Sequence, residues 1–116
     1  MKCIALALVA LCAFTQFVSA GATPLPVRGT GKVAANSTWY HAITFRAGEL
    51  ACLEVIGDHD TDLDLYIYDE NGNLVACDDD LTDVCIVRWV PKWTGTFLIK
   101  VVNRGSVYNQ FTLSTN

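Results

Sequence analysis

From Ala35 onward, apolar and polar residues alternate in short runs that are separated by turn residues. Successive side chains of a β-strand point to opposite faces of a sheet, so a period of two is typical of strands with one buried face. Seven such runs follow one another at a spacing of about 8–12 residues, and no window has the helical period of 3.6. The pattern predicts an all-β fold, a single antiparallel β-sandwich over residues 35–116, and excludes a helical protein.

The apolar positions of these runs define the predicted core. The sequence Asn71-Gly72, between two of the runs, predicts a tight hairpin, because both residues tolerate the backbone that such turns require. Trp39 and Trp89 are assigned to the core by their parity. The residues expected to face inward are Ile43, Phe45, Leu53, Val55, Leu63, Leu65, Ile67, Val87, Trp89, Phe97, Ile99, Val101, Phe111 and Leu113.

The N-terminal segment has the features of a secretory signal peptide. Residues 4–14 are an uncharged apolar run that follows Lys2, and Ser19-Ala20 place small residues at the end of the segment. We expect cleavage after Ala20. The run is shorter than the roughly 20 residues of a membrane span, so the mature chain is predicted to have no transmembrane segment. Residues 21–34 read as a short linker, and the protein is expected to be secreted or periplasmic.

The charges are strongly segregated along the chain. Ten of the 12 acidic residues lie between Asp58 and Asp83, and this segment contains no Lys or Arg. Such a segment repels phosphates, which argues against nucleic acid as a partner. It indicates either an interaction with cations or a solvated surface that keeps the protein soluble.

The acidic residues suggest a calcium site that is not an EF-hand. The run that begins at Asp58 has acids at alternate positions, but Leu63 stands where an EF-hand requires glycine, and Asp69 where it requires glutamate. Loops 58–62 and 78–83 are expected at the same end of the sandwich. Their carboxylates could bind Ca²⁺, which prefers oxygen ligands; the alternative is a solvated acidic rim. The predicted ligands are Asp58, Asp60, Asp62, Asp78, Asp79 and Asp80.

Three cysteines remain after the predicted cleavage: Cys52, Cys77 and Cys85. Cys77 and Cys85 flank the second acidic loop and are predicted to form a disulfide across a hairpin. The alternative is that Cys52 pairs with one of them, because spacing alone does not fix the connectivity.

Aromatic residues provide the candidate ligand-binding surface. Tyr66 and Tyr68 share the strand face opposite Leu65 and Ile67, Trp93 lies in a predicted turn, and Tyr40 flanks the first strand. Exposed aromatic rings stack on sugars or pack on extended polypeptides. The alternative is that the two tyrosines only pair with neighbours across the sheet.

The sequence offers little for catalysis. His41 and His59 are the only histidines, and no serine lies in a Gly-x-Ser-x-Gly motif. The chain is predicted not to be an enzyme, and a small hydrolase is the remote alternative.

The run Asp62-Leu-Asp-Leu-Tyr-Ile-Tyr-Asp69, the acidic loop Asp78-Asp-Asp80 and the strand start Thr94-Gly-Thr-Phe97 resemble the bacterial pre-peptidase C-terminal domain family. The resemblance covers residues 39–113. It implies a jelly-roll-like β-sandwich, a capping role for Asp64 at neighbouring turn amides, and calcium binding in some relatives. It also implies a secreted, non-enzymatic accessory module that docks to a polysaccharide or an extracellular protein. The alternative is a structural or envelope-associated domain without a specific ligand.

Overall fold

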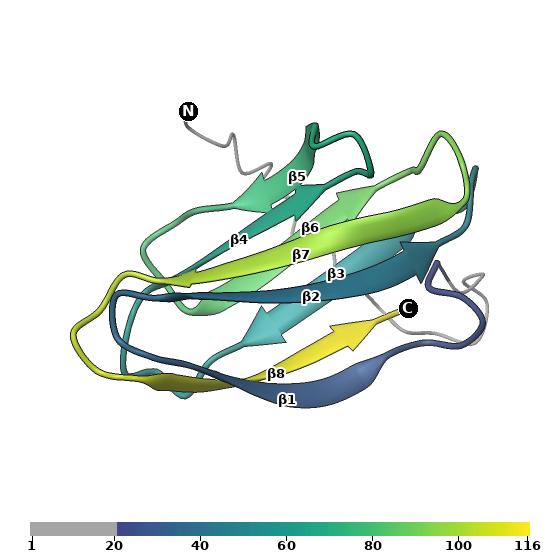
Figure 1. Ribbon diagram of the computed structural model, residues 1–116. Helices are drawn as coiled ribbons and strands as arrows, with labels where there is room; N and C mark the ends of the chain where they lie inside the picture. The colour runs from purple at the N-terminus through teal and green to yellow at the C-terminus, as the bar shows by residue number, and fades with distance from the viewer. Residues whose placement is uncertain (1–20) are drawn as a thin grey trace.

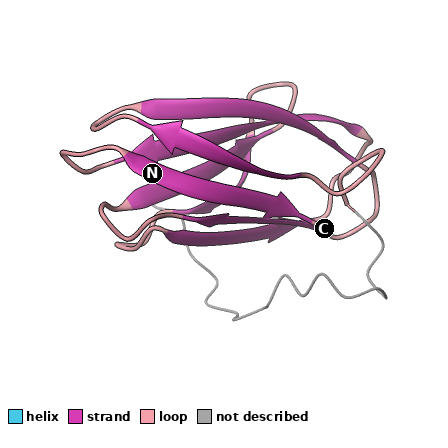
Figure 2. Ribbon diagram, turned by 90° about the horizontal axis from the view of Figure 1, so that it is seen from below, coloured by secondary structure: helices cyan, strands magenta, loops and turns pink. Residues whose placement is uncertain are grey.

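The computed structural model describes residues 21–116, and the predicted signal peptide lies outside them. All regular structure in this part of the chain is β-strand, so it holds no helix that could cross a membrane (Figure 2). The strands are β1 (Arg28–Val33), β2 (Thr38–Phe45), β3 (Ala51–Ile56), β4 (Leu63–Tyr68), β5 (Leu74–Asp78), β6 (Val84–Trp89), β7 (Gly95–Asn103) and β8 (Asn109–Thr115).

The strands form two four-stranded antiparallel sheets packed face to face (Figure 1). One sheet has the order β1-β8-β3-β6 and the other β2-β7-β4-β5. Consecutive strands therefore alternate between the sheets, and β4–β5 is the one consecutive pair that is hydrogen-bonded within residues 21–116. This is the arrangement of a jelly roll, in which two Greek keys close around one core. The predicted antiparallel β-sandwich is confirmed.

The core lies between the sheets and matches the predicted parity. Every residue predicted to face inward is buried. Phe45, Trp89 and Phe97 form an aromatic cluster at one end of the core, with ring centroids 4.8–5.9 Å apart. At the edge formed by β1 and β2, the half-buried Trp39 meets the Phe111 ring at 5.0 Å and so joins the two sheets.

Strand β1 corrects the prediction of a linker over residues 21–34. β1 pairs with the whole length of β8, and Ala22 is fully buried beside Phe45. The alternation rule missed this strand because two of its three inward positions are Gly29 and Gly31, and only the last, Val33, has a buried apolar side chain. The Phe111 ring occupies the space where a Gly31 side chain would lie.

The predicted Cys77–Cys85 disulfide is wrong. Cys85 is a free thiol in the core, and its Sγ donates a hydrogen bond to the carbonyl oxygen of Leu63 at 3.2 Å. Cys77 faces outward, because it is the cross-strand partner of Tyr66 on the outer face of the other sheet. The chain between them crosses from one sheet to the other instead of forming a hairpin. Because Cys85 is free, it does not pair with Cys52 either.

The role of β1 can be tested with two glycines of the same strand. A methyl group at Gly31 would overlap the Phe111 ring, which is buried and held against Trp39, whereas a methyl group at Gly29 meets no atom within 4 Å. We therefore expect Gly31→Ala to destabilise the protein by about 1–3 kcal/mol. Gly29→Ala should change the stability by less than about 0.5 kcal/mol. Urea unfolding of the two variants measures the difference, and equal effects would show that β1 is not docked on β8.

Candidate functional site

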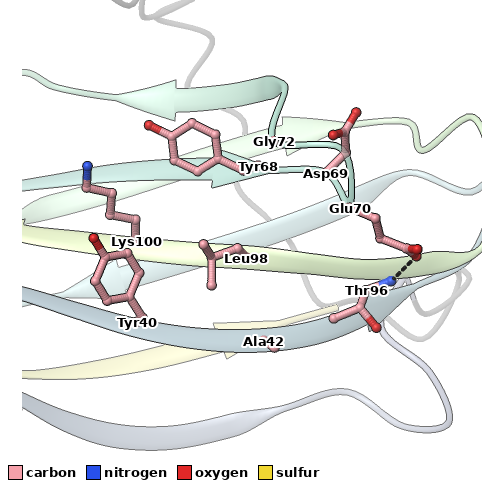
Figure 3. A pocket seen from close by; sticks show the side chains of 9 residues that line it. All are labelled: Tyr40, Ala42, Tyr68, Asp69, Glu70, Gly72, Thr96, Leu98 and Lys100. Atoms are coloured by element: carbon pink, nitrogen blue, oxygen red, sulfur yellow. Dashed lines mark hydrogen bonds between the residues drawn. The ribbon is translucent and has the colours of Figure 1, made fainter.

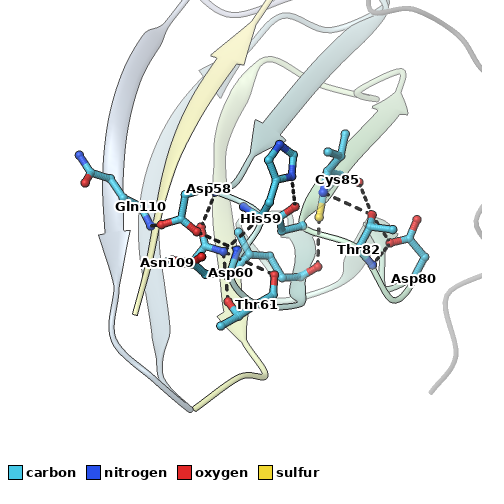
Figure 4. Close-up of polar contacts among 12 residues, drawn as sticks. Asp58, His59, Asp60, Thr61, Asp80, Thr82, Cys85, Asn109 and Gln110 are labelled. Atoms are coloured by element: carbon cyan, nitrogen blue, oxygen red, sulfur yellow. Dashed lines mark hydrogen bonds and ion pairs between the residues drawn. The ribbon is translucent and has the colours of Figure 1, made fainter. Parts of the chain in front are cut away.

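The two acidic loops lie at one end of the sandwich, as predicted (Figure 4). The N–H of Gly57 donates to the carbonyl oxygen of Asp83 at 2.9 Å, and the N–H of Leu63 donates to that of Thr82 at 3.3 Å. The Asp83 carboxylate is buried and accepts hydrogen bonds from the His59 N–H and from Asn109 Nδ2. Backbone and side-chain bonds thus hold the β3–β4 and β5–β6 loops together.

Some of the predicted calcium ligands are instead used to hold the backbone. The Asp58 carboxylate accepts from the N–H of Gln110 at 2.9 Å and from that of Asp60 at 3.1 Å. The Gln110 bond is the main reason that the pKa of Asp58 lies below its ordinary value. Asp80 Oδ1 accepts from both the N–H and the hydroxyl of Thr82 at 2.9 Å. These oxygens stabilise the loops themselves.

Asp62 and Asp78 are the carboxyl groups whose charge is costly in the folded state. Burial raises the pKa of Asp62, and repulsion from Asp64 and Asp80 raises it further. Burial also raises the pKa of Asp78, although the N–H of Ile86 donates to its Oδ2 at 3.0 Å. Asp62 Oδ1 and Asp64 Oδ1 are buried without a hydrogen-bond partner among the described residues. A cation beside Asp62 would offset the repulsion between Asp62 and Asp64.

The six predicted ligands are not arranged around a common point. Within residues 21–116, no three His, Cys, Asp or Glu side chains are grouped closely enough to hold a metal ion. Asp60 is exposed at the loop tip, whereas Asp78 is buried at the end of β5. Calcium binding therefore stays a prediction, and Asp62 and Asp64 are the carboxylates at this end of the sandwich that keep a buried oxygen without a hydrogen-bond partner among the described residues.

Asp64 does not cap turn amides as the resemblance implied. Its Oδ2 accepts a hydrogen bond from Arg104 Nε at 2.7 Å, and Arg104 Nη2 lies 3.4 Å from the Tyr66 hydroxyl. The bond to Asp64 is the main cause that raises the pKa of Arg104. The turn is capped by Asp69 instead, whose Oδ1 accepts from the N–H groups of Asn71 and Asn73 at 2.9 Å each.

The outer face of the β2-β7-β4-β5 sheet carries two cross-strand rows of side chains. The strand registers place Tyr40 opposite Lys100, and Lys100 opposite Tyr66. The next row runs through Ala42, Leu98 and Tyr68. Directly opposed residues lie about 5 Å apart at Cβ, so each row forms a continuous surface.

These rows line a shallow open groove of about 560 Å³ (Figure 3). Tyr40, Lys100 and Tyr68 lie toward one end of it, and the Asp69–Asn73 turn with Glu70 closes the other. Tyr40 and Leu98 are exposed, and Tyr68 and Lys100 are half-buried. The groove thus offers aromatic and aliphatic surface beside one ammonium group, all reachable from solvent.

The two carboxylates of the groove have structural partners. Asp69 accepts the two turn amides and also Asn73 Nδ2 at 3.2 Å, and these bonds lower its pKa. Glu70 Oε1 accepts from the N–H of Thr96 at 2.8 Å, which ties the turn to β7. Neither is paired with a second carboxyl group in the manner of a general acid and base.

Trp93 lies outside this groove. It is 40% exposed in the β6–β7 loop and lines a second groove of about 550 Å³ together with Trp89, Val90 and Pro91. Asp69 lines both grooves, so the two surfaces meet at the β4–β5 turn. Of the three predicted ligand-binding residues, the structure therefore places Tyr68 in the first groove, Tyr66 beside Lys100 next to it, and Trp93 in the second.

Parity reasoning found Tyr66 and Tyr68 but not the partners that complete the groove. Tyr40, Leu98 and Lys100 lie on β2 and β7, which are far from β4 in sequence. Their adjacency depends on the pairing of β7 between β2 and β4. Alternation along the strand predicts that Tyr40 faces outward, but it does not predict which residues of β7 lie beside it.

No protein-family model matches the sequence, and no curated protein matches it. Solved structures do match it in fold. The pre-peptidase C-terminal domain of a collagenase from Bacillus anthracis is 12% identical, with a TM-score of 0.68, and the alignment covers 79% of this chain and 90% of that one. This chain has the fold of a pre-peptidase C-terminal domain. A mitogen from Yersinia pseudotuberculosis is also 12% identical, with a TM-score of 0.52 and coverage of 80% and 86%.

Calcium should stabilise this pre-peptidase C-terminal fold through Asp62. Extracellular calcium modules bind with dissociation constants of about 0.1–1 mM, and a 100-fold excess of ligand adds about 2.7 kcal/mol. We expect CaCl₂ to raise the Tm above the value in NaCl of equal ionic strength. Asp62→Asn should remove this excess, whereas Glu54→Gln on the outer face of the other sheet should retain it. Equal Tm values in the two salts would show that the acidic end is only solvated.

The Asp69 cap should make the turn sensitive to acid. Because the folded-state pKa of Asp69 lies below its ordinary value of 3.8, its contribution to stability is complete above that value and is lost as the pH falls through the folded-state pKa. We expect Asp69→Ala to lower the Tm at neutral pH, and the difference from wild type to shrink as the pH falls below 3.8. Asp69→Asn, which keeps an acceptor oxygen, should lower the Tm by less than Asp69→Ala does. A difference that does not change with pH would contradict the assigned cap.

Proposed function

We propose that the protein is a secreted, non-enzymatic accessory module that binds an extended extracellular polymer in the groove of the β2-β7-β4-β5 sheet. The observation that supports it most is the cluster of Tyr40, Leu98 and Tyr68 on one sheet face, where Tyr40 and Leu98 are exposed and Tyr68 is half-buried. Most aromatic and aliphatic side chains of a sheet are buried, and those that are exposed are usually scattered singly over the surface. A contiguous exposed cluster of such side chains marks a binding surface.

The shape and the polar groups of the groove support binding rather than catalysis. The groove lies on an open sheet face rather than in an enclosed cavity, which suits a polymer that lies across the face. The carboxylates that line it, Asp69 and Glu70, are hydrogen-bonded to backbone amides of the turn and of β7. Tyrosines offer a flat apolar face together with a hydroxyl group, which suits sugars and extended polypeptides alike.

The proposed secretion follows from the predicted signal peptide and agrees with the fold, which is shared with a domain of a collagenase. The alternative is a structural or envelope-associated domain without a specific ligand. In that case the tyrosines of the outer face would serve only cross-strand pairing, as Lys100 over the Tyr66 ring at 5.7 Å illustrates.

The proposal is tested by retention of residues 21–116 on immobilised polysaccharides and on collagen fibres. We expect Tyr40→Ala and Tyr68→Ala each to weaken binding at least about fivefold, because removal of a contact aromatic costs more than about 1 kcal/mol. Tyr108→Ala is the matched control, since Tyr108 is equally exposed but lies in the β7–β8 loop beside Lys32.

The outcomes separate the two functions. Loss of binding in the groove variants, with retention in Tyr108→Ala, supports the proposal. An equal loss in all three variants places the contact elsewhere and overturns it. If the wild-type protein is retained on none of these supports, the structural alternative is favoured.

A further inference from the structure

Lys100 has no acidic residue directly opposite it on either flanking strand. Its direct neighbours across the two flanking strands are Tyr40 and Tyr66. The acid nearest along β4 on this face is Asp64, which is two residues from Tyr66 and is bound by Arg104. Among residues 21–116, Lys100 forms no ion pair. Its ammonium group instead lies over an aromatic ring.

The groove has its positive and negative groups at different places. Figure 3 shows Lys100 beside Tyr40, with Tyr68 in the same half of the groove, and Asp69 and Glu70 at the turn that closes the other end. Both carboxylates accept hydrogen bonds from backbone N–H groups, which hold them in the turn. Lys100 is the cationic residue among those that line the groove, whereas Glu70 is an exposed anion at the turn. The groove thus offers one ammonium group, although the whole chain has a net charge of −4.

We propose that the groove takes a polysaccharide that carries carboxylate groups, and that Lys100 binds these carboxylates while Tyr40 and Tyr68 contact the sugar rings. This inference rests on the proposed function and names its ligand class. A lysine without an ionic partner between two tyrosines is complementary to a uronic acid unit, which has a carboxylate at the edge of a ring with an apolar face.

The dimensions of the groove favour a polysaccharide over a folded protein. A volume of about 560 Å³ lies within the range of small-ligand clefts and suits a short run of sugar units. A stable protein partner usually covers about 800 Å² on each side, which extends well beyond this groove. Because the groove is open, the hydroxyl groups of a bound sugar chain could stay hydrated.

The experiment compares two forms of one polymer, polygalacturonate and its fully methyl-esterified derivative, which differ in the charge of each unit. We expect the wild-type protein to bind the charged form about five- to tenfold more tightly at low salt. The preference should fall as NaCl is added, because an exposed ionic contact is screened. Titration calorimetry or affinity electrophoresis measures both affinities.

Lys100→Gln should abolish the preference for the charged polymer and keep the affinity for the ester. Lys32→Gln is the matched control, because Lys32 also lies over a tyrosine ring, at 4.1 Å from the Tyr108 centroid, but belongs to the other sheet. The Lys32→Gln variant should prefer the charged polymer over the ester as strongly as the wild-type protein does. The Tm of both variants confirms that they fold.

Equal binding of both polymers by wild type, or an unchanged preference in Lys100→Gln, would overturn the inference. If such binding still depended on Tyr68, the proposed function would stand with a neutral polysaccharide as its ligand. Binding to collagen fibres and to neither polymer would assign a protein partner, and would likewise overturn the inference. Binding to none of these probes would remove the inference and the proposed function together.

Discussion

The structure depends on the burial of one apolar layer that both sheets share. Apart from β4 and β5, consecutive strands lie in different sheets, so neither sheet can form from one continuous stretch of chain. The Phe45–Trp89–Phe97 cluster and the Trp39–Phe111 contact join the sheets at the two ends of the layer. Apolar burial contributes about 25 cal/mol per Å² and is the main stabilising term for a domain with little else to connect its layers.

This layered arrangement places three groups of residues on separate surfaces, although the residues of each group are scattered along the sequence. The acidic loops gather at one end, the Asp69–Asn73 turn and the Trp93 loop lie at the other, and the tyrosine–lysine groove lies on a sheet face between them. Arg104 has a special place in this separation, since it binds Asp64 at the boundary between the acidic end and the groove. The dense negative charge of residues 58–83 thus contributes few groups to the groove itself.

Sequence reasoning predicted which side chains face inward, because that depends on alternation within one strand. It did not predict which residues of distant strands become neighbours. Inward residues such as Leu65 and Phe97 and the outward direction of Tyr66 follow from alternation alone. The partners of Tyr66 could not be predicted, because the registers of β2, β7 and β4 are set by the packing of the whole sandwich. The same limit explains the wrong Cys77–Cys85 disulfide: short spacing suggested a hairpin where the chain changes sheets. β1 was missed for a different reason, since Gly31 leaves its inward place to the ring of Phe111.

The pairing of β4 with β5 also bears on how the chain acquires its structure. It is the one ladder within residues 21–116 that joins consecutive strands, and the Asp69 cap and Gly72, with a φ of 82°, favour its turn locally. Every other ladder needs segments that are distant in sequence, and closing such long loops slows folding to the range of milliseconds to seconds. The β4–β5 hairpin is thus the element that can form first, and the strand that carries Tyr66 and Tyr68 would be ordered before the rest of the groove exists.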